Sequence, residues 1–265
     1  MIILLYLRSA KHNNMANPII IAVANHKGGV GKTASTATLS AILASKGKKV
    51  LMIDLDTQSN LTRHFMEEIP ERVIYHAIRD RRDLPIYEVR ENLHLVPSSL
   101  DMAGIEIDMT SMRKREYVIR DLLAPVQEDY DFIFMDCPPS LGLISLNALT
   151  AANKVLIPMK ADLMSYYGLS MMDKFLADMQ DLNPGIQIDF IFFNIYEKGQ
   201  ILTESIEADV RSNYGDRVMK TFVRKNNEIS KAAFGYTDIV SYNPNANGSK
   251  DFKALAEELL EKVGK

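Results

Sequence analysis

Short apolar runs recur along the chain and alternate with stretches of helical character. Each run is apolar almost throughout, rather than alternately apolar and polar, which is typical of strands buried on both faces of a sheet. The first run, PIIIAVA, covers residues 18–24. The others cover residues 48–56, 91–99, 130–140, 153–160 and 186–194. The pattern therefore predicts six buried strands.

Helical segments separate these strands. Residues 32–47 (KTASTATLSAILASKG) are predicted to form a helix that ends at Gly47, because glycine commonly terminates helices. Helices between buried strands imply right-handed crossovers and a mostly parallel sheet. The sequence contains no internal repeat and no linker rich in Pro, Gly or Ser. We predict a single-domain α/β fold with helices on both faces of the sheet.

Composition and charge narrow the class of protein. The 265 residues fit one large domain, and 47% hydrophobic with 25% charged residues is ordinary for a soluble globular protein. The net charge is −3, so any contact with nucleic acid must come from a local basic patch. A single cysteine, Cys137, excludes an intrachain disulfide and a zinc cluster. It favours a reducing, cytoplasmic location.

The first residues need a separate interpretation. The apolar run MIILLYL is too short for a signal peptide core or a membrane span. A second methionine, Met15, directly precedes the first predicted strand. We expect residues 1–14 to be an upstream extension or a disordered tail, and residues 15–265 to be the domain. The alternative is that residues 1–14 form a short extra strand or a tail that binds a partner.

A glycine-rich loop follows the first predicted strand. Residues 25–36, NHKGGVGKTAST, nearly match the phosphate-binding pattern G-x-x-x-x-G-K-[ST], but His26 replaces the first glycine and Lys27 is an additional lysine. Glycines let backbone N–H groups surround phosphate oxygens, and the helix that follows points its positive end at the same anion. Lys32 is placed to reach the β- and γ-phosphates and Thr33 to bind Mg²⁺. The candidate nucleotide-binding residues here are Lys27, Gly28, Gly29, Val30, Gly31, Lys32, Thr33 and Ala34. The alternative is a plain glycine turn.

Acidic residues end two other predicted strands. Asp136 closes the run FIFMD, the usual place for an acid that holds Mg²⁺, although a strand-end Asp can also be merely exposed. Asp54 and Asp56 follow the run VLMI and would face the same way if the strand continues. One could order the waters of the metal and the other the attacking water, or one could cap the next helix. Asn194 ends the last strand, and all these strand ends should meet at one edge of the sheet.

These motifs together resemble the ParA/MinD family of deviant Walker A ATPases, also called the SIMIBI class. The resemblance rests on KGGVGKT with Lys27, on DLDTQSN at residues 54–60, and on DFIFMDCPPS at residues 131–140. Residues 223–259 are similar to the C-terminal region of ParA proteins. The resemblance runs from about residue 18 to the end of the chain. It implies a single-domain P-loop NTPase.

The resemblance also implies roles for individual residues. It implies a homodimer that forms with ATP and Mg²⁺, in which Lys27 reaches the phosphates of the other subunit. Lys27, Lys32 and Asp56 would be catalytic, with Asp56 positioning the attacking water. Further roles follow for the metal site (Thr33, Asp54 and Asp136), for the adenine (Asn194) and for bracing of the segment near Asp56 (Asn60). His26, Ala34 and Thr57 depart from the common family pattern and leave the turnover rate open.

The last predicted helix, KDFKALAEELLEKVGK, distinguishes two branches of this family. MinD-like members end in a basic amphipathic helix that lies on anionic lipid. Here the apolar stripe faces away from three acids, which anionic lipid would repel. The stripe is Phe252, Leu255, Leu259 and Val263, and the acids are Glu257, Glu258 and Glu261. We predict that the stripe packs on the domain core and that the protein does not bind membranes.

Residues 211–231 form the candidate DNA-binding segment. Six basic residues stand there against Asp216 and Glu228, in a chain that is acidic overall. They are Arg211, Arg217, Lys220, Arg224, Lys225 and Lys231. Dimerisation would double this surface, which could then bind DNA phosphates without sequence preference. The alternative is an ordinary solvated face.

The sequence thus predicts a slow ATPase for plasmid or chromosome partition, cytoplasmic and associated with the nucleoid. It would dimerise with ATP and Mg²⁺, bind DNA non-specifically, and be switched off by a ParB-like partner that stimulates hydrolysis. A ParA-like ATPase that positions a protein cargo is the main alternative. A metabolic P-loop enzyme is a third, disfavoured because a single cysteine cannot supply a pair that bridges a cluster.

Overall fold

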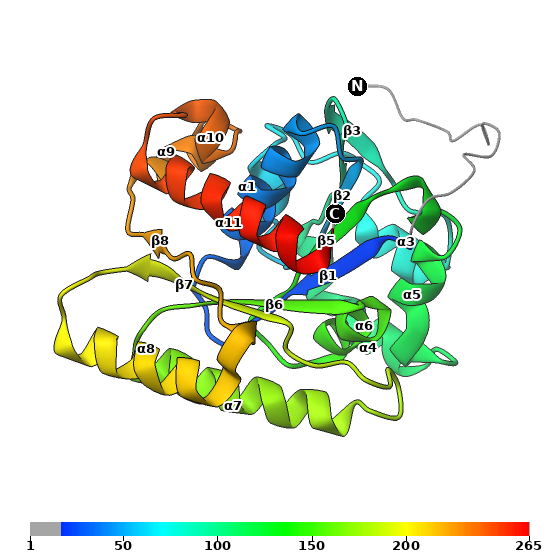
Figure 1. The fold of residues 1–265 in the computed structure, drawn as a ribbon. Coiled ribbons are helices and arrows are strands. Elements are labelled where there is room, and N and C mark those ends of the chain that lie inside the picture. The colour runs from blue at the N-terminus through cyan, green and yellow to red at the C-terminus, as the bar shows by residue number, and fades with distance from the viewer. Residues whose placement is uncertain (1–16, 265) are drawn as a thin grey trace.

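One sheet of eight strands organises the molecule in the computed structural model, which describes residues 17–264 (Figure 1). The expectation for residues 1–14 lies outside the described residues. The strand order is β3-β4-β2-β5-β1-β6-β7-β8. The strands are β1 (Ile19–Val23), β2 (Val50–Asp54), β3 (Tyr87–Arg90), β4 (Leu93–Val96), β5 (Phe132–Asp136), β6 (Lys154–Met159), β7 (Phe190–Tyr196) and β8 (Val223–Arg224). Each neighbouring pair is parallel except β3 with β4.

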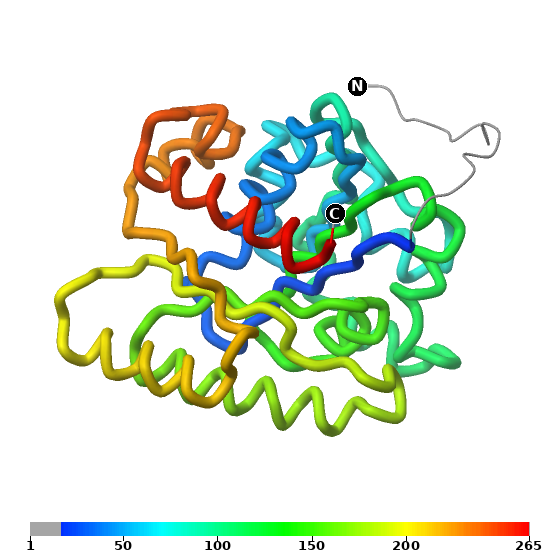
Figure 2. The backbone as a smooth tube through the Cα atoms, in the orientation of Figure 1, coloured from blue at the N-terminus to red at the C-terminus, as the bar shows by residue number. Residues whose placement is uncertain are grey.

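Helices cover both faces of this sheet, as predicted (Figures 1 and 2). One face carries α1 (Lys32–Ser45), α2 (Asn60–Arg63), α9 (Glu228–Phe234), α10 (Ile239–Tyr242) and α11 (Asn247–Val263). The other carries α3 (Ile74–Asp80), α4 (Ile105–Thr110), α5 (Val118–Leu123), α6 (Leu143–Ala151), α7 (Leu163–Asp178) and α8 (Ile201–Tyr214). The single-domain α/β prediction is therefore confirmed for the described residues.

The six central strands are largely apolar because each contributes side chains to two cores. Along β1, Ile21 and Val23 pack on the side of α1 and α11, whereas Ile20 and Ala22 pack on the side of α6 and α7. Each fully buried aliphatic side chain stabilises the fold by roughly 1.5–3 kcal/mol. All six predicted strands are present in this two-sided arrangement. The strands β3 and β8 lie at the two edges of the sheet and were not predicted.

The last helix packs on the domain core, as the sequence predicts. Phe252, Leu255 and Leu259 of α11 are at most 1% exposed and pack against α1, and Val263 packs partly on the same cluster. The apolar stripe is therefore engaged in packing contacts within the domain. No helix among residues 17–264 is long and apolar enough to cross a membrane.

Acidic side chains of α11 occupy the outer side of the edge strand β8. Glu258 accepts hydrogen bonds from the backbone N–H groups of Lys220 and Thr221, at 2.7 and 2.9 Å. Asp251 accepts one from the backbone N–H of Arg224 at 3.0 Å. At the opposite edge, β3 runs antiparallel to β4 and its register shifts between Glu88 and Arg90. At the β8 edge, backbone N–H groups thus already have hydrogen-bond partners, and at the β3 edge the pairing of the strand is irregular.

Candidate functional site

The candidate site lies where β1, β2, β5 and β7 end on the carboxyl side of the sheet. Val23 of β1 and Asp54 of β2 both pair in register with Asp136 of β5, so three strand ends lie in one row. The loop from Asn25 to Gly31 leaves β1 at this row and leads into α1. The structure therefore brings the glycine loop and the strand-end acids together.

Glycine geometry and Asn194 shape the loop. Gly29 and Gly31 have φ angles of 70° and 91°, in the left-handed region that favours glycine. A Cβ on Gly31 would lie 2.1 Å from Nδ2 of Asn194, far inside van der Waals contact. That Nδ2 donates a hydrogen bond of 2.8 Å to the carbonyl of Val30. Asn194 thus braces the loop, and only glycine fits at position 31.

Lys32 is folded over the same loop. Its side chain is almost buried, and Nζ donates to the carbonyls of Asn25 and Lys27 at 3.1 and 3.2 Å. Burial lowers the pKa of Lys32, while the charge of Asp136 acts in the opposite direction. The ammonium group therefore sits at the centre of the loop, where it can meet an anion.

Thr33 and Asp136 form the contact from which a magnesium site can be built. Thr33 Oγ1 donates a hydrogen bond of 2.7 Å to Asp136 Oδ2. The other oxygen, Asp136 Oδ1, is buried with no hydrogen-bond partner among the described residues. Burial, and next the charge of Asp54, raise the pKa of Asp136 well above its usual range.

This donor set fits a hard divalent cation. An unpaired buried carboxylate oxygen is costly, and a cation relieves that cost. Mg²⁺ binds one or two protein oxygens together with phosphates and water, and Thr33 and Asp136 offer a hydroxyl and a carboxylate. Within residues 17–264, no group of three or more His, Cys, Asp or Glu side chains could hold a metal by itself. A Mg²⁺ ion bound by Thr33 and Asp136 would need further ligands from a nucleotide and from water.

Asp54 is fully buried and already engaged. Its oxygens accept hydrogen bonds from the N–H of Thr62 (2.8 Å), the hydroxyl of Thr62 (2.7 Å) and the N–H of Asp56 (3.1 Å). Burial raises the pKa of Asp54 to about 6, although the bonds from Thr62 act to lower it. In this arrangement Asp54 ties the end of β2 to α2. Its part as a metal ligand stays a prediction.

Asp56 lies in a turn beyond the strand and is partly exposed. Because β2 ends at Asp54, the alternation of side chains along the strand does not extend to Asp56. Asp56 Oδ1 accepts a hydrogen bond of 3.0 Å from the N–H of Gln58. Its side chain lines a cleft of about 350 Å³ together with Glu106 and Pro139. Asn60 is the exposed first residue of α2, so its bracing role stays a prediction too.

Lys27 points to α7 of its own chain. Its Nζ lies 2.7 and 2.8 Å from the two carboxylate oxygens of Asp162, and both side chains are partly exposed. Asp162 also caps α7 by accepting a hydrogen bond of 2.8 Å from the N–H of Ser165. Partial burial acts to raise the pKa of Asp162, but the hydrogen bonds from Lys27 and from Ser165 lower it overall. Sequence reasoning missed Asp162; its only signal is an Asp directly before a helix.

The two polar groups of the Asn194 side chain are both engaged. Besides the bond to Val30, its Oδ1 accepts a hydrogen bond of 2.9 Å from the N–H of Ile195. Ile195 has a φ of 55°, which a β-branched residue rarely adopts. A contact between Asn194 and a base would need one of these bonds to be exchanged.

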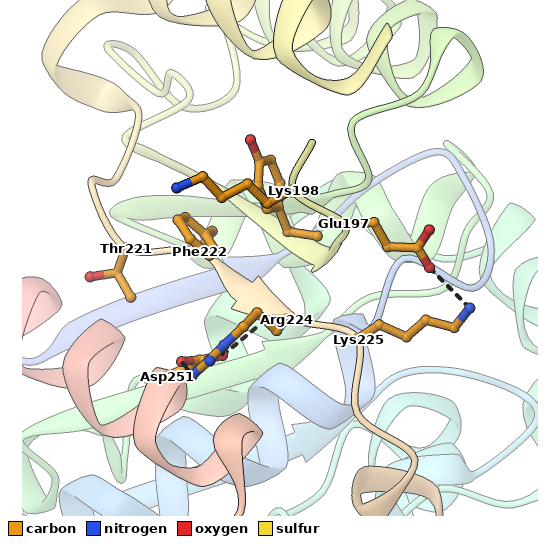
Figure 3. Close-up of a pocket in the computed structure, with 8 residues that line it drawn as sticks. Glu197, Lys198, Thr221, Phe222, Arg224, Lys225 and Asp251 are labelled. Carbon is orange, nitrogen blue, oxygen red and sulfur yellow. Dashed lines mark hydrogen bonds and ion pairs between the residues drawn. The ribbon is translucent and has the colours of Figure 1, made fainter. Parts of the chain in front are cut away.

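The six candidate DNA-binding residues extend along the β8 edge, from α8 to α9, and most have acidic neighbours. Four of them form ion pairs within the chain: Arg211–Glu207 (2.8 Å), Arg224–Asp251 (2.6 Å), Lys225–Glu197 (3.0 Å) and Lys231–Glu228 (2.7 Å). Arg217 and Lys220 are exposed and have no ion pair within the part of the chain that the structure describes. The positive charge of this segment is therefore partly offset by carboxylates that the fold brings beside it (Figure 3).

Comparison of the sequence with known proteins finds a matching family model and related proteins. A family model described as an AAA domain matches residues 19–188. The "Chromosome-partitioning ATPase Soj" of Treponema pallidum is 33% identical over 248 residues, covering 91% of this chain and 96% of that protein.

Solved structures share the fold over nearly the whole chain. A "putative plasmid partition protein" from Borrelia burgdorferi, bound to AMPPNP, has a TM-score of 0.81 and 27% identity and covers 92% of this chain and 99% of its own. The cobyrinic acid a,c-diamide synthase of Mycobacterium smegmatis, with a bound ATP analogue and magnesium, has a TM-score of 0.80 and 26% identity, covering 94% and 96%. Proteins of different activity therefore share this fold.

Proposed function

Because this chain belongs to the Soj/ParA family of partition ATPases, we propose that it is an ATP-dependent dimerising ATPase that partitions plasmid or chromosomal DNA. The observation that carries the proposal is the position of the second lysine. Lys27 belongs to the phosphate loop, yet its ammonium contacts α7 beside the loop. This partly exposed cation lies at the rim of the site, where a second subunit would reach it once its ion pair with Asp162 opens.

ATP would bind across the glycine loop. The loop amides and Lys32 would contact the phosphates, and the N-terminus of α1 favours the same negative charge. Thr33 and Asp136 would hold Mg²⁺, which neutralises charge on the β- and γ-phosphate oxygens. The unpaired Oδ1 of Asp136 supports this assignment. Asp54 would act on the metal through its neighbours, and Asn194 would keep the loop in shape close to the adenine.

Hydrolysis would couple to assembly. In a face-to-face dimer, Lys27 of one subunit would contact the phosphates bound by the other, as a cation supplied in trans. Asp56, in the exposed turn after β2, would position the attacking water. A slow reaction of this kind acts as a timer, because it decides how long the dimer lasts.

The dimer would bind nucleoid DNA through its basic residues. Arg217 and Lys220 are available, while Arg211, Arg224, Lys225 and Lys231 must exchange a carboxylate for a phosphate. Two copies of the surface would act together, which favours non-specific binding that is sensitive to salt. A ParB-like partner would stimulate hydrolysis and release the dimer. The protein would then work in the cytoplasm, at the nucleoid.

Binding to random-sequence duplex DNA tests this function. Wild-type protein with ATP and Mg²⁺ should bind, more weakly at higher salt, and protein without nucleotide should not. The double variant Arg224→Ala with Lys225→Ala should weaken binding. A double variant Lys250→Ala with Lys253→Ala, which removes equal charge from α11, is the matched control. Wild-type binding that is absent, or the same with and without ATP, would overturn the DNA assignment.

One observation favours a second candidate function. Because four of the six basic residues are paired with acids of the same chain, the surface could serve a protein partner rather than DNA. The chain would then position a protein cargo. ATP-dependent dimerisation without DNA binding in the same assay would favour this alternative.

A further inference from the structure

The cleft of about 350 Å³ beside Asp56 is lined by three parts of the chain. The turn after β2 contributes residues 55–58, and the segment after β5 contributes residues 138–140. The third part includes Glu106 of α4, which lies outside the phosphate loop and the strand ends. Among the described residues that line the cleft, Asp56 and Glu106 are the two that carry a charge. A second carboxylate therefore lies close to the proposed water-positioning residue.

Glu106 caps the N-terminus of α6 from a different helix. Its Oε1 accepts a hydrogen bond of 3.1 Å from the N–H of Ile144, in the first turn of α6. The residue at the N-cap position of α6 is Gly142, which has no side chain that could cap, and the first turn contains no acid. A carboxylate at this place also meets the positive end of the helix dipole. Glu106 therefore supplies the cap that α6 lacks in its own sequence.

The carboxylate of Glu106 packs directly against Gly142. A Cβ on Gly142 would lie 3.0 Å from Oε2 of Glu106 and closer still to Oε1. The backbone of Gly142 has a φ of −88°, which any residue can adopt. The space at position 142 is thus kept free for the carboxylate, and not for the sake of the backbone.

The segment between β5 and α6 depends on such contacts because it begins with two prolines. Pro138 and Pro139 carry no N–H and so cannot donate backbone hydrogen bonds to neighbouring segments. The carbonyl of Pro139 instead lies 3.1 Å from Nδ1 of His26 in the phosphate loop. The carbonyl of Ser140 accepts a hydrogen bond from the hydroxyl of Ser145 in α6. Side chains therefore hold this segment, and the cap on α6 holds its far end.

The position of this segment matters for the chemistry beside it. A water positioned by Asp56 would have to fit between the turn after β2 and residues 138–140. The rate of a reaction between positioned groups can fall about 100-fold when one of them moves by about 1 Å. A side chain that fixes one wall of the cleft can therefore change turnover without touching the nucleotide.

We propose that Glu106 is a positioning residue for ATP hydrolysis. By capping α6 and filling the space at Gly142, it holds residues 138–142 where the cleft has the width that Asp56 needs to orient the attacking water. The inference rests on the proposed role of Asp56 and adds a residue from α4 to the machinery. Because Glu106 acts through this segment, its loss should lower kcat and leave nucleotide binding unchanged.

Hydrolysis of radiolabelled ATP by the full chain with Mg²⁺, over a range of ATP concentrations, tests the proposal. Glu106→Ala should lower kcat about three- to tenfold, which is the range of a lost helix cap, with KM within about twofold of wild type. Glu106→Gln keeps a carbonyl oxygen that can accept the N–H of Ile144. This conservative variant should therefore keep kcat within about twofold of wild type.

Gly142→Ala displaces the carboxylate instead of removing it. Glu106 is exposed, so its side chain can swing away at little cost to the fold. The kcat of this variant should fall as in Glu106→Ala. The double variant Glu106→Ala with Gly142→Ala should be no slower than Glu106→Ala alone, because no carboxylate is left to displace. Two independent losses of stability would add up instead.

Asp108→Ala is the matched control, since it removes a carboxylate from the same helix. Asp108 accepts a hydrogen bond from the hydroxyl of Tyr75 and does not line the cleft, so kcat should stay within about twofold of wild type. Urea unfolding of each variant measures folding separately. A Glu106→Ala protein that is less stable but keeps the kcat of wild type would make Glu106 a structural cap only and overturn the proposal.

The variant Asp56→Asn separates the inference from its premise. Wild type that does not hydrolyse ATP, or Asp56→Asn that hydrolyses it as fast as wild type, would overturn the proposed role of Asp56, and the inference falls with it. If Asp56→Asn is slow while Glu106→Ala and Gly142→Ala match the control, the inference alone is overturned. A Glu106→Gln protein as slow as Glu106→Ala would also contradict it, because the capping bond would then not be what matters.

Discussion

Lys27 Nζ contacts both carboxylate oxygens of Asp162, the residue that caps α7. The lysine proposed to serve a second subunit is thus held within its own chain by an ion pair. If Lys27 acts in trans, this pair must open when two subunits meet. Asp162 would then restrain dimerisation, and replacing its carboxylate should measurably strengthen dimerisation.

Asp162→Asn should promote ATP-dependent dimerisation. The variant removes the charge that holds Lys27, while Asn keeps the ability to cap α7. The protein concentration at which half the chains are dimers should fall about two- to fivefold, as expected for a partly exposed ion pair. Light scattering coupled to size-exclusion chromatography, with ATP and Mg²⁺, measures this. Asp162→Ala also loses the cap, so it should destabilise the fold by about 1 kcal/mol. Dimerisation of Asp162→Asn that is weaker than in wild type would contradict a restraining role.

Lys27→Ala should separate folding from assembly. Its ammonium binds a partly exposed Asp, so the change should alter the free energy of unfolding by less than about 1 kcal/mol. Dimerisation with ATP, or hydrolysis, should be strongly impaired, while a monomer still binds nucleotide through Lys32. Fluorescent-nucleotide binding and sedimentation give the two readouts. A variant that dimerises and hydrolyses ATP like wild type would rule out the trans role of Lys27.

Gly31→Ala should damage the loop, whereas Gly28→Ala should not. At Gly31 the φ of 91° and the approach of Asn194 leave no room for a methyl group, so the change should cost about 1–3 kcal/mol of folding free energy and abolish nucleotide binding. Gly28 has no positive φ and nothing lies within 4 Å of its Cβ position. Urea unfolding compares the two variants, and equal losses would show that Asn194 does not confine the loop.

The buried carboxyl of Asp54 should make stability depend on pH. Its pKa is about 6 in the folded protein and near 3.8 in the unfolded chain, so the folded state holds the proton more tightly. Without nucleotide and Mg²⁺, the free energy of unfolding should therefore fall by up to about 3 kcal/mol as the pH rises from about 4 to about 6. The raised pKa of Asp136 acts in the same direction.

The variant Asp54→Asn isolates this contribution. Urea unfolding from pH 4.5 to 7.5 should show that wild type loses more stability with rising pH than Asp54→Asn does. The expected sign is opposite to that of a carboxylate whose pKa is lowered by an ion pair. Identical pH profiles for the two proteins would mean that Asp54 stays ionised in the fold.

Much of the fold and the loop was predictable because the signals are local. The six central strands appear as continuous apolar runs, since each is buried on both faces. The contact of Thr33 with Asp136 follows from a phosphate loop and a strand that end at the same edge of the sheet. Glycine, lysine and strand-end acids carry this information within a few residues of sequence.

What was missed depends on contacts between distant segments. The strand β3 contains Glu88 and Arg90 and lies half exposed at an edge, so it lacks an apolar run. The strand β8 has two residues and is defined only by its pairing with β7. The pairing of Lys27 with Asp162 spans 135 positions in the chain. The acidic partners of Arg224 and Lys225 are likewise set by how α11 and the loop after β7 lie against β8.

The two edges of the sheet have a consequence for how copies of the chain can associate. An open edge strand can recruit another strand and so build fibres without limit. Here Glu258 and Asp251 accept hydrogen bonds from amides at and beside β8, and the strand at the other edge, β3, pairs irregularly with β4. Edge-to-edge growth is therefore disfavoured at the β8 edge, where these amides already have partners, and at the β3 edge, where the strand is short and irregular. The face-to-face dimer proposed for the loops around the phosphate site would instead close on itself after two copies.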